Sequence, residues 1–188
     1  FIEAPSTANE VLTCNTLLKQ NQDPGFQAYL ISELISRTYF HNMVTHLLEA
    51  AFQREVYTRL DRDEYLNGDI LCQIKLDLIK EFWGEDFEIG EDAGLIWMRQ
   101  PHYYMGLYPY TYSAGLVIST AGYLHLKSSE NGAKDWLDLL KSGGSKTPLE
   151  SAMIIGADIS TDKPLRDTIQ FLSDTVDQII AYSAELGE

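Results

Sequence analysis

The chain has 188 residues, and its 14 Lys and Arg against 28 Asp and Glu give a formal net charge of −14 at pH 7. A charge of this sign repels a phosphate backbone, so sequence-independent nucleic-acid binding is not expected. Hydrophobic residues make up 45% of the chain. At this length that is enough for a substantial core, which excludes a disordered protein.

No segment has the roughly 20 consecutive apolar residues of a membrane span, because the uncharged stretch 101–126 is interrupted by Pro, Gly, Tyr and His. The chain opens on Phe1 without a basic segment followed by an apolar one, so we expect no signal peptide and expect part of a longer polypeptide. Cys14 and Cys72 have apolar neighbours. We predict buried thiols in a reducing compartment, which indicates a cytoplasmic protein.

Apolar residues recur at helical spacing over residues 26–60, which predicts one long helix or two in series. The same spacing over 69–83 predicts a helix that ends at Gly84. A further helix is predicted over 131–140. The glycines that follow it belong to a Gly-Gly-Ser-Lys run, which lacks the spacing of a phosphate-binding loop and is interpreted as helix termination.

Thr147 and Glu150 have the spacing of a capping box, and Pro148 stands at the first helical position, so a short helix is predicted to about residue 155. A last helix is predicted from about Pro164 to near residue 186. Residues 84–94 and 141–146 are predicted to be loops. Because no segment alternates with a period of two, we predict an all-α fold.

Tyrosines gather next to His102. Five of the 11 lie within residues 102–112, namely Tyr103, Tyr104, Tyr108, Tyr110 and Tyr112. Phenols remain protonated at neutral pH, so such a cluster offers hydrogen-bond donors of the kind that stabilise an oxyanion in acyl transfer or hydrolysis. The alternative is that these aromatic residues only pack a loop, and the residues alone leave both interpretations open.

The first ten residues read FIEAPSTANE. If a helix begins here, Glu3, Thr7 (or Ser6) and Glu10 share one face, where two carboxylates and a hydroxyl could bind a metal and support its ligand. The alternative is an acidic first turn that favours the helix dipole.

The histidines outside these segments carry weaker signals. His41 and His46 are five residues apart rather than the four that place two imidazoles on one zinc. We therefore predict both as surface or packing residues, and we predict the same for His125.

Together, two of these segments resemble the C-terminal part of the oligoendopeptidase F branch of the thimet-oligopeptidase-like zinc metallopeptidases. Residues 1–10 are similar to the family's segment for the third zinc ligand. Residues 97–115, WMRQPHYYMGLYPYTYSAG, are similar to its His/Tyr substrate loop, and LLKSGGS (139–145) and GAD (156–158) to its usual ending. The resemblance covers essentially the whole chain. It implies that residues 1–188 are the helical C-terminal portion of a larger, mostly helical catalytic domain.

The resemblance implies a zinc-dependent endopeptidase that hydrolyses short unfolded oligopeptides, with one Zn²⁺ in each complete active site. The family's H-E-x-x-H helix supplies two zinc-binding imidazoles and the general base, and it lies upstream of the segment that opens this chain. No such motif occurs in the 188 residues. The implied partners are peptide substrates and the N-terminal remainder of the same polypeptide, and the 188-residue chain alone is expected to be catalytically inert.

For the metal, the resemblance implies that Glu3 is the third zinc ligand and that Glu10 orients a ligating imidazole. For the substrate, it implies that His102 hydrogen-bonds the peptide backbone or the scissile carbonyl oxygen.

Among the tyrosines, Tyr108 and Tyr112 are the implied oxyanion and substrate contacts, with Tyr110 as the substitute. Tyr103 and Tyr104 are expected to pack the loop. A non-catalytic helical peptide-binding or docking module with a peptidase-like fold remains the alternative, because the residues that would decide lie outside this sequence.

Overall fold

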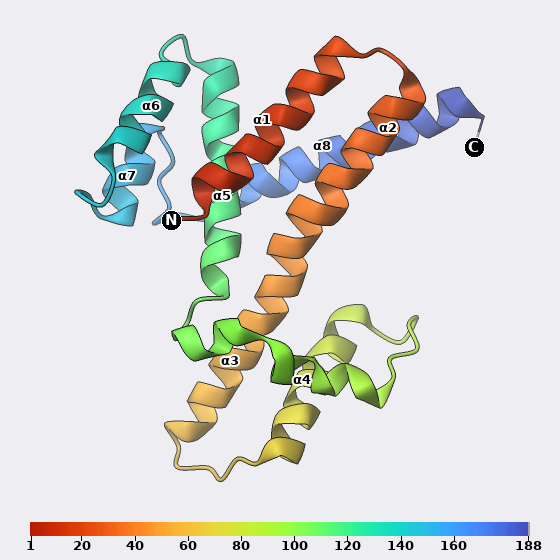
Figure 1. Cartoon of the computed structure of the whole chain (residues 1–188), viewed down its shortest axis with the longest axis vertical. Coiled ribbons are helices and arrows are strands. Elements are labelled where there is room, and N and C mark those ends of the chain that lie inside the picture. The colour runs from red at the N-terminus through yellow and green to blue at the C-terminus, as the bar shows by residue number, and fades with distance from the viewer. Residues whose placement is uncertain (188) are drawn as a thin grey trace. The chain divides into compact units, whose positions relative to one another are not determined.

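The structure is a computed structural model that describes residues 1–187, and helices joined by turns make up almost all of it (Figure 1). No strand occurs in the described part of the chain, so the all-α prediction is confirmed. The α-helices are α1 (Ala4–Gln20), α2 (Pro24–Glu33), α3 (His46–Leu60), α4 (Gly68–Trp83), α5 (Tyr110–Ser128), α6 (Gly132–Ser142), α7 (Pro148–Ile154) and α8 (Lys163–Leu186). A π-helix, η1 (Leu34–Thr45), and two 3₁₀ helices, η2 (Glu91–Arg99) and η3 (Pro101–Met105), complete the list.

The chain divides into two compact units, which are described separately. Unit 1 comprises Phe1–Met43 together with the chain from Tyr112 onward, and unit 2 is Val44–Thr111. Within residues 1–187, no helix combines the length and the apolar character needed to cross a bilayer.

Several helix ends follow the local sequence signals. The side chain of Asn67 caps α4 by accepting a hydrogen bond from the Ile70 amide at 2.9 Å, and Gly84 ends this helix with a φ of 70°. Gly143 ends α6 with a φ of 51°, a value that glycine adopts without strain. The glycine run after α6 therefore terminates a helix, as predicted.

The predicted capping box of α7 is present. The Glu150 amide donates to Thr147 Oγ1 at 3.3 Å, and the Thr147 amide donates to Glu150 Oε2 at 2.8 Å. These two hydrogen bonds satisfy amides that a helix start otherwise leaves without partners. The prediction of the last helix is confirmed as well, because α8 begins at Lys163 and ends at Leu186.

Four helices lie outside the predicted ones: α1, for which only a possible start was considered, η2, η3 and α5. The interval expected as a loop over 84–94 contains the start of η2, and α5 covers part of the Tyr-rich segment. The glycines of α5 weaken its intrinsic helix propensity, but packing explains them. A Cβ on Gly115 would lie 3.2 Å from the Ala4 amide nitrogen, and one on Gly122 would lie 2.6 Å from the Trp136 ring. Both glycines thus allow close approach by α1 and α6.

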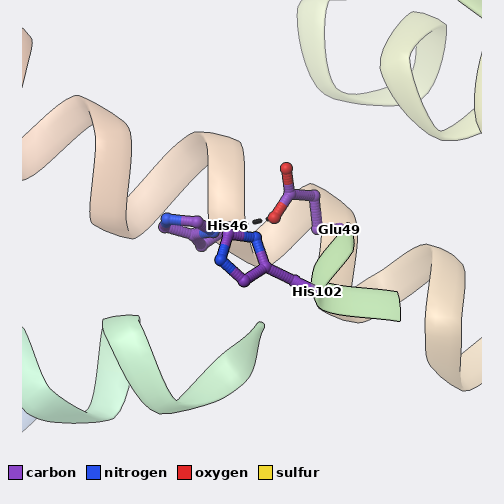
Figure 2. A group of neighbouring side chains, drawn as sticks. All are labelled: His46, Glu49 and His102. Carbon is purple, nitrogen blue, oxygen red and sulfur yellow. Dashed lines mark hydrogen bonds and ion pairs between the residues drawn. The ribbon is translucent and has the colours of Figure 1, made fainter. Parts of the chain in front are cut away.

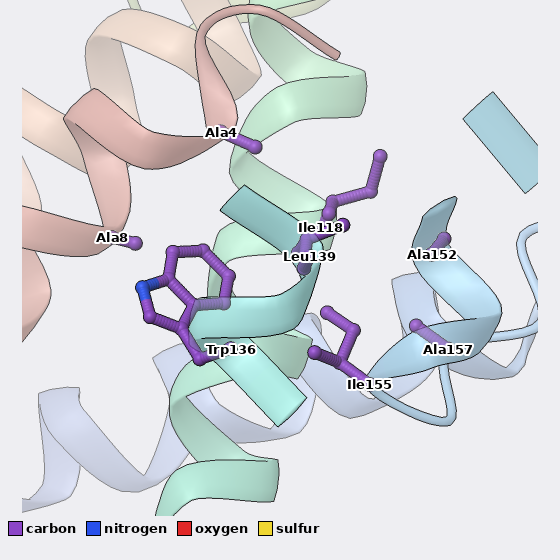
Figure 3. Packing of buried hydrophobic residues seen from close by; sticks show 8 residues of the cluster. All are labelled: Ala4, Ala8, Ile118, Trp136, Leu139, Ala152, Ile155 and Ala157. Atoms are coloured by element: carbon purple, nitrogen blue, oxygen red, sulfur yellow. The ribbon is translucent and has the colours of Figure 1, made fainter. Parts of the chain in front are cut away.

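An apolar cluster forms the first part of the unit 1 core, and Figure 3 shows it around Trp136. Its buried members are Ala4, Ala8, Ile118, Trp136, Leu139, Ala152, Ile155 and Ala157. Figure 3 shows Ala8 beside the indole ring and Ala152 and Ala157 beyond Ile155, so small and large side chains together fill this part of the core. A second cluster, which includes Val11, Leu34, Tyr39 and Leu116, continues the core of this unit.

The interior of unit 2 is built differently. Helix α4 packs against η2 and α3. A Cβ on Gly94 would lie 2.6 Å from the backbone oxygen of Cys72, so η2 approaches α4 at backbone distance. Phe52 stacks on Trp97 with ring centroids 6.2 Å apart. Beside these rings, polar side chains of α3 and α4 are buried, and they belong to the candidate site.

Candidate functional site

The N-terminal segment begins α1 and lies in unit 1. Glu3 is half-buried at the N-cap position, and its carbonyl oxygen accepts a hydrogen bond from the Thr7 amide at 3.2 Å. The backbone that carries the Glu3 carboxylate is therefore fixed by the first helical turn.

The predicted shared face of α1 is only partly present. Thr7 is buried, and its hydroxyl donates to Ser119 Oγ at 2.8 Å, so this hydroxyl serves packing rather than a ligand. Glu10 is exposed and accepts a hydrogen bond from the hydroxyl of the buried Thr38. Of the two hydroxyls predicted as alternatives on this face, Thr7 is buried and Ser6 is exposed.

The His/Tyr loop places its residues in different environments. In unit 2, the His102 ring stacks on Tyr108, with centroids 5.6 Å apart and an interplanar angle of 19°. Gly106 and Leu107 between them have φ values of 47° and 49°, a tight reversal that is unusual for leucine. Tyr110 is 51% exposed. In unit 1, Tyr112 is half-buried in α5.

The two tyrosines expected to pack the loop behave differently. Tyr103 packs against Phe52 with ring centroids 5.1 Å apart, and its buried hydroxyl has no hydrogen-bond partner within residues 1–187. Burial raises the pKa of Tyr103, and the negative charge of Glu49 adds to the effect. Tyr104 is 86% exposed, so its predicted packing role is wrong. On the short 3₁₀ helix η3, the Tyr103 side chain is turned inward and the Tyr104 side chain is turned to solvent.

A cluster of three side chains lies beside the loop, and we call it the His46 cluster. Figure 2 shows His102 reaching from η3 toward His46 and Glu49 on α3. His46 Nδ1 and Glu49 Oε2 are 2.7 Å apart, and both residues are buried. The His46 and His102 rings meet edge to face at 5.7 Å. Each of the three side chains offers a ligand atom within 4.8 Å of the other two.

Neighbouring groups hold the Glu49 carboxylate in place. Gln100 donates to Oε1, the oxygen that does not face His46. Burial alone would raise the pKa of the Glu49 carboxyl, but the hydrogen bond and charge of His46, together with Gln100 and Lys75, outweigh it and hold this pKa below its usual range. Burial lowers the pKa of Lys75, and the charge of Glu49 opposes that change.

Sequence reasoning missed the His46 cluster. His46 was compared with His41, which is exposed on η1, whereas its partner is Glu49 three residues later on the same helix face. The His-x-x-Glu spacing was the available signal. The third member, His102, is more than fifty residues away in sequence, and local spacing does not predict such a contact.

The remaining predicted residues have structural roles. His125 is half-buried with its Nε2 2.8 Å from Asp135 Oδ2, as a packing histidine would be. Both cysteines are free thiols, and burial raises the pKa of Cys14. Cys72 is only half-buried, with its sulfur 3.4 Å from the Trp97 indole nitrogen, which corrects the prediction of two buried thiols.

Comparison with known proteins identifies the class. Residues 1–171 match the sequence profile of Peptidase family M3, so the chain belongs to this family. A crystal structure of oligoendopeptidase-F from Enterococcus faecium has the same fold, with a TM-score of 0.88 and 22% identity, over 97% of this chain and 35% of that one. The predicted resemblance to the oligoendopeptidase F branch is thereby confirmed.

Two related proteins show how much of each sequence the similarity covers. Oligopeptidase PepF of Bacillus subtilis (strain 168) is 25% identical over 178 residues, which cover 94% of this chain and 26% of that protein. The oligoendopeptidase F homolog of Borreliella burgdorferi is 27% identical over 182 residues, or 94% of this chain and 30% of that protein. The chain thus spans about a quarter to a third of the length of these relatives.

Proposed function

We propose that this chain supplies the C-terminal part of a zinc-dependent endopeptidase that hydrolyses short unfolded oligopeptides. The observation that carries the proposal is the match to Peptidase family M3 over residues 1–171, within which lie both the Glu3 segment and the His102 loop. Two free thiols are in keeping with a reducing, cytoplasmic location.

The residues of the Glu3 segment fit the role of a partial metal site. Glu3 offers one half-buried carboxylate on a fixed helix start, while a catalytic zinc site takes three protein ligands. Within residues 1–187, the one group of three donors close enough for a metal does not include Glu3. The other two ligands would be the imidazoles of an upstream H-E-x-x-H helix, one of them oriented by Glu10.

A zinc ion held by these residues would supply Lewis-acid chemistry toward a peptide carbonyl. The chain's own contribution is then the donor loop. His102 and Tyr108 stack on each other, which restricts both rings, and their polar atoms would donate to the substrate backbone and to the oxyanion. Tyr112 is the second proposed hydroxyl donor, and the more exposed Tyr110 is the substitute.

The test uses the full-length protein and two kinds of variant. Tyr108→Phe and Tyr112→Phe keep the ring and delete the hydroxyl, so donor roles predict a loss in kcat on the order of 10²-fold with little change in KM. Glu3→Ala should lower the zinc retained after dialysis. Tyr104→Phe is the matched control, because its ring is 86% exposed and outside the proposed contacts. Normal kcat in both Phe variants and normal zinc content in Glu3→Ala would reject these roles.

A docking module without catalysis is the second candidate, and one feature of α8 favours it. Leu165, Ile169, Val176 and Ile180 are each more than 40% exposed on this helix. Exposed apolar surface of this kind marks an interaction site. In the peptidase interpretation the partner is the N-terminal remainder of the polypeptide. Peptide binding by the full-length protein without cleavage would favour the docking module.

The peptidase interpretation predicts that the purified 188-residue chain does not cleave peptides by itself. Adding the N-terminal piece should then restore cleavage that is sensitive to a chelator. A quenched-fluorescent peptide assay with and without that piece measures both states, and chelator-sensitive cleavage by the 188-residue chain alone would contradict the division of roles.

A further inference from the structure

We propose that His46, Glu49 and His102 form a binding site for one divalent transition-metal ion of the zinc type. None of the three is part of the proposed zinc site at Glu3. The proposal rests on the geometry and chemistry of the His46 cluster within unit 2 and does not depend on the proposed peptidase activity.

The geometry is close to that of a metal site before the ion enters. Tetrahedral zinc with bonds of 2.0–2.1 Å places its ligand atoms about 3.4 Å apart. In the cluster, one ligand atom from each residue lies within 4.8 Å of the other two. Metal binding would therefore draw the three ligand atoms closer together than they lie in the cluster without an ion.

The donor set selects the class of ion. Two imidazoles and one carboxylate match the His₂Glu set of catalytic zinc sites, which keep a fourth position open. Imidazole suits zinc, copper, nickel and iron, whereas calcium and magnesium prefer oxygen ligands alone. The site should therefore bind Zn²⁺ or Co²⁺ and ignore Mg²⁺.

The surroundings support the ligands. His46 and Glu49 are 2% and 4% exposed, and a rigid helix carries both. Gln100 donates to the second oxygen of the Glu49 carboxylate. Outer-shell hydrogen bonds of this kind orient ligands and raise metal affinity. An entering ion would take the place of the contact between His46 Nδ1 and Glu49 Oε2, which are 2.7 Å apart.

The charge of Lys75 is expected to oppose metal binding. Its buried side chain acts electrostatically on Glu49, with its ammonium 5.8 Å from the Phe52 ring centroid. In the absence of a metal, Lys75 compensates the carboxylate charge. A bound ion would take over that role and would be repelled by the ammonium. Removing the Lys75 charge should therefore strengthen metal binding, although it removes a polar group from the interior.

An occupied site would also use the imidazole of His102, which the proposed function assigns to the substrate. The two uses exclude each other in one molecule at one time. Binding must for this reason be measured directly, rather than through activity.

The experiment is a titration of the chelator-treated 188-residue chain with Co²⁺, followed by visible absorption, with Zn²⁺ affinity from competition against a chromogenic chelator. Circular dichroism of each variant reports its folding. We expect one equivalent of metal for each wild-type chain and no response to Mg²⁺. Glu49→Gln and His102→Gln should each weaken binding by at least the 10- to 100-fold that loss of an outer-shell partner costs.

Two control variants should leave metal binding unchanged, and a third variant should strengthen it. His125→Gln removes a half-buried histidine that is also paired with a carboxylate, and Glu3→Gln removes the carboxylate of the other proposed site. Neither should alter binding, whereas Lys75→Met should tighten it. Absence of a saturable equivalent in the folded wild-type chain would overturn the proposal. So would unchanged affinity in folded His102→Gln, or loss of binding in Glu3→Gln.

Discussion

The two units of the molecule bury different kinds of side chain. Unit 1 encloses Trp136 among alanine, isoleucine and leucine, and its other buried polar side chains are neutral hydroxyls and amides. In unit 2, the interior contains His46, Glu49 and Lys75. Among the Asp, Glu, Lys, Arg and His residues within 1–187, these three are the buried ones, and all of them lie in unit 2.

The two interiors differ in what their burial costs. Burying an apolar side chain is favourable at every site where it fits, whereas burying a charge is costly unless the charge is paired and hydrogen-bonded. Unit 2 meets that condition through the contacts of Glu49 with His46 and Gln100. The His46 cluster, whose three side chains could bind a ligand, therefore lies in the unit whose interior is harder to stabilise.

The largest expected effect lies in unit 1. Trp136→Ala leaves a cavity among the small side chains of Ala4 and Ala8, and such changes cost about 3–5 kcal/mol in the free energy of unfolding. Urea denaturation followed by circular dichroism measures the loss. Leu137→Ala on the same helix is the control, because Leu137 is 51% exposed and should change stability much less. Equal losses in both variants would mean that the cluster does not hold the unit together.

A smaller but still large effect is expected in unit 2. Glu49→Ala removes the carboxylate that pairs with the buried His46 and accepts from the half-buried Gln100, and it removes the charge that acts on the buried Lys75. Loss of a buried hydrogen-bond partner costs about 1–3 kcal/mol. Urea denaturation again measures the loss. Glu55→Ala is the control on the same helix: its ion pair with Arg59 is partly exposed, and pairs of that kind contribute about 0–1 kcal/mol. If Glu49→Ala matches Glu55→Ala, the polar interior contributes nothing to folding.

The pH dependence of stability sharpens the same contrast. The pKa of Glu49 in the folded chain lies below its ordinary value of 4.5, so the unfolded chain binds the proton more readily. The stabilising contribution is therefore present above the unfolded pKa and is lost as pH falls through the folded pKa. We expect the free energy of unfolding to decrease less steeply below about pH 5 in Glu49→Gln than in the wild type. A Glu49→Gln profile parallel to the wild type would contradict this account.

Sequence reasoning succeeded where the determinants are local. The start of α7 and the glycine at the end of α4 follow from neighbouring residues, and the structure contains both. It failed for α5, because Gly115 and Gly122 reduce helix propensity and are explained only by the distant groups that pack on them. Helix α5 is thus stabilised by tertiary contacts that local propensity does not contain.

The site shows the same division. The resemblance assigns roles to the Glu3 segment and the His102 loop from contiguous residues, and these roles stay predictions. His46 was predicted as a surface or packing residue from its spacing to His41, because local spacing does not give the partner across from a helix. The proximity of His46 to His102 depends on how η3 returns to α3, which no local spacing encodes.

The smallest expected effect is at the capping box of α7, which lies in unit 1. Thr147→Ala removes the acceptor for the Glu150 amide, and loss of such a cap costs about 1 kcal/mol. The Thr147 amide also holds the pKa of the Glu150 carboxyl below its usual range, with the hydroxyl adding to the effect. Thr147→Ser keeps the hydroxyl and should remain within a few tenths of a kcal/mol of the wild type in urea denaturation, since Ser and Thr rank close together as caps. Because α6 and α7 pack on each other and α7 carries Ala152 of the Trp136 cluster, a loss as large as that of Trp136→Ala would show that the cap controls the core. A loss near 1 kcal/mol in Ala and none in Ser would show that the local signal acts only locally.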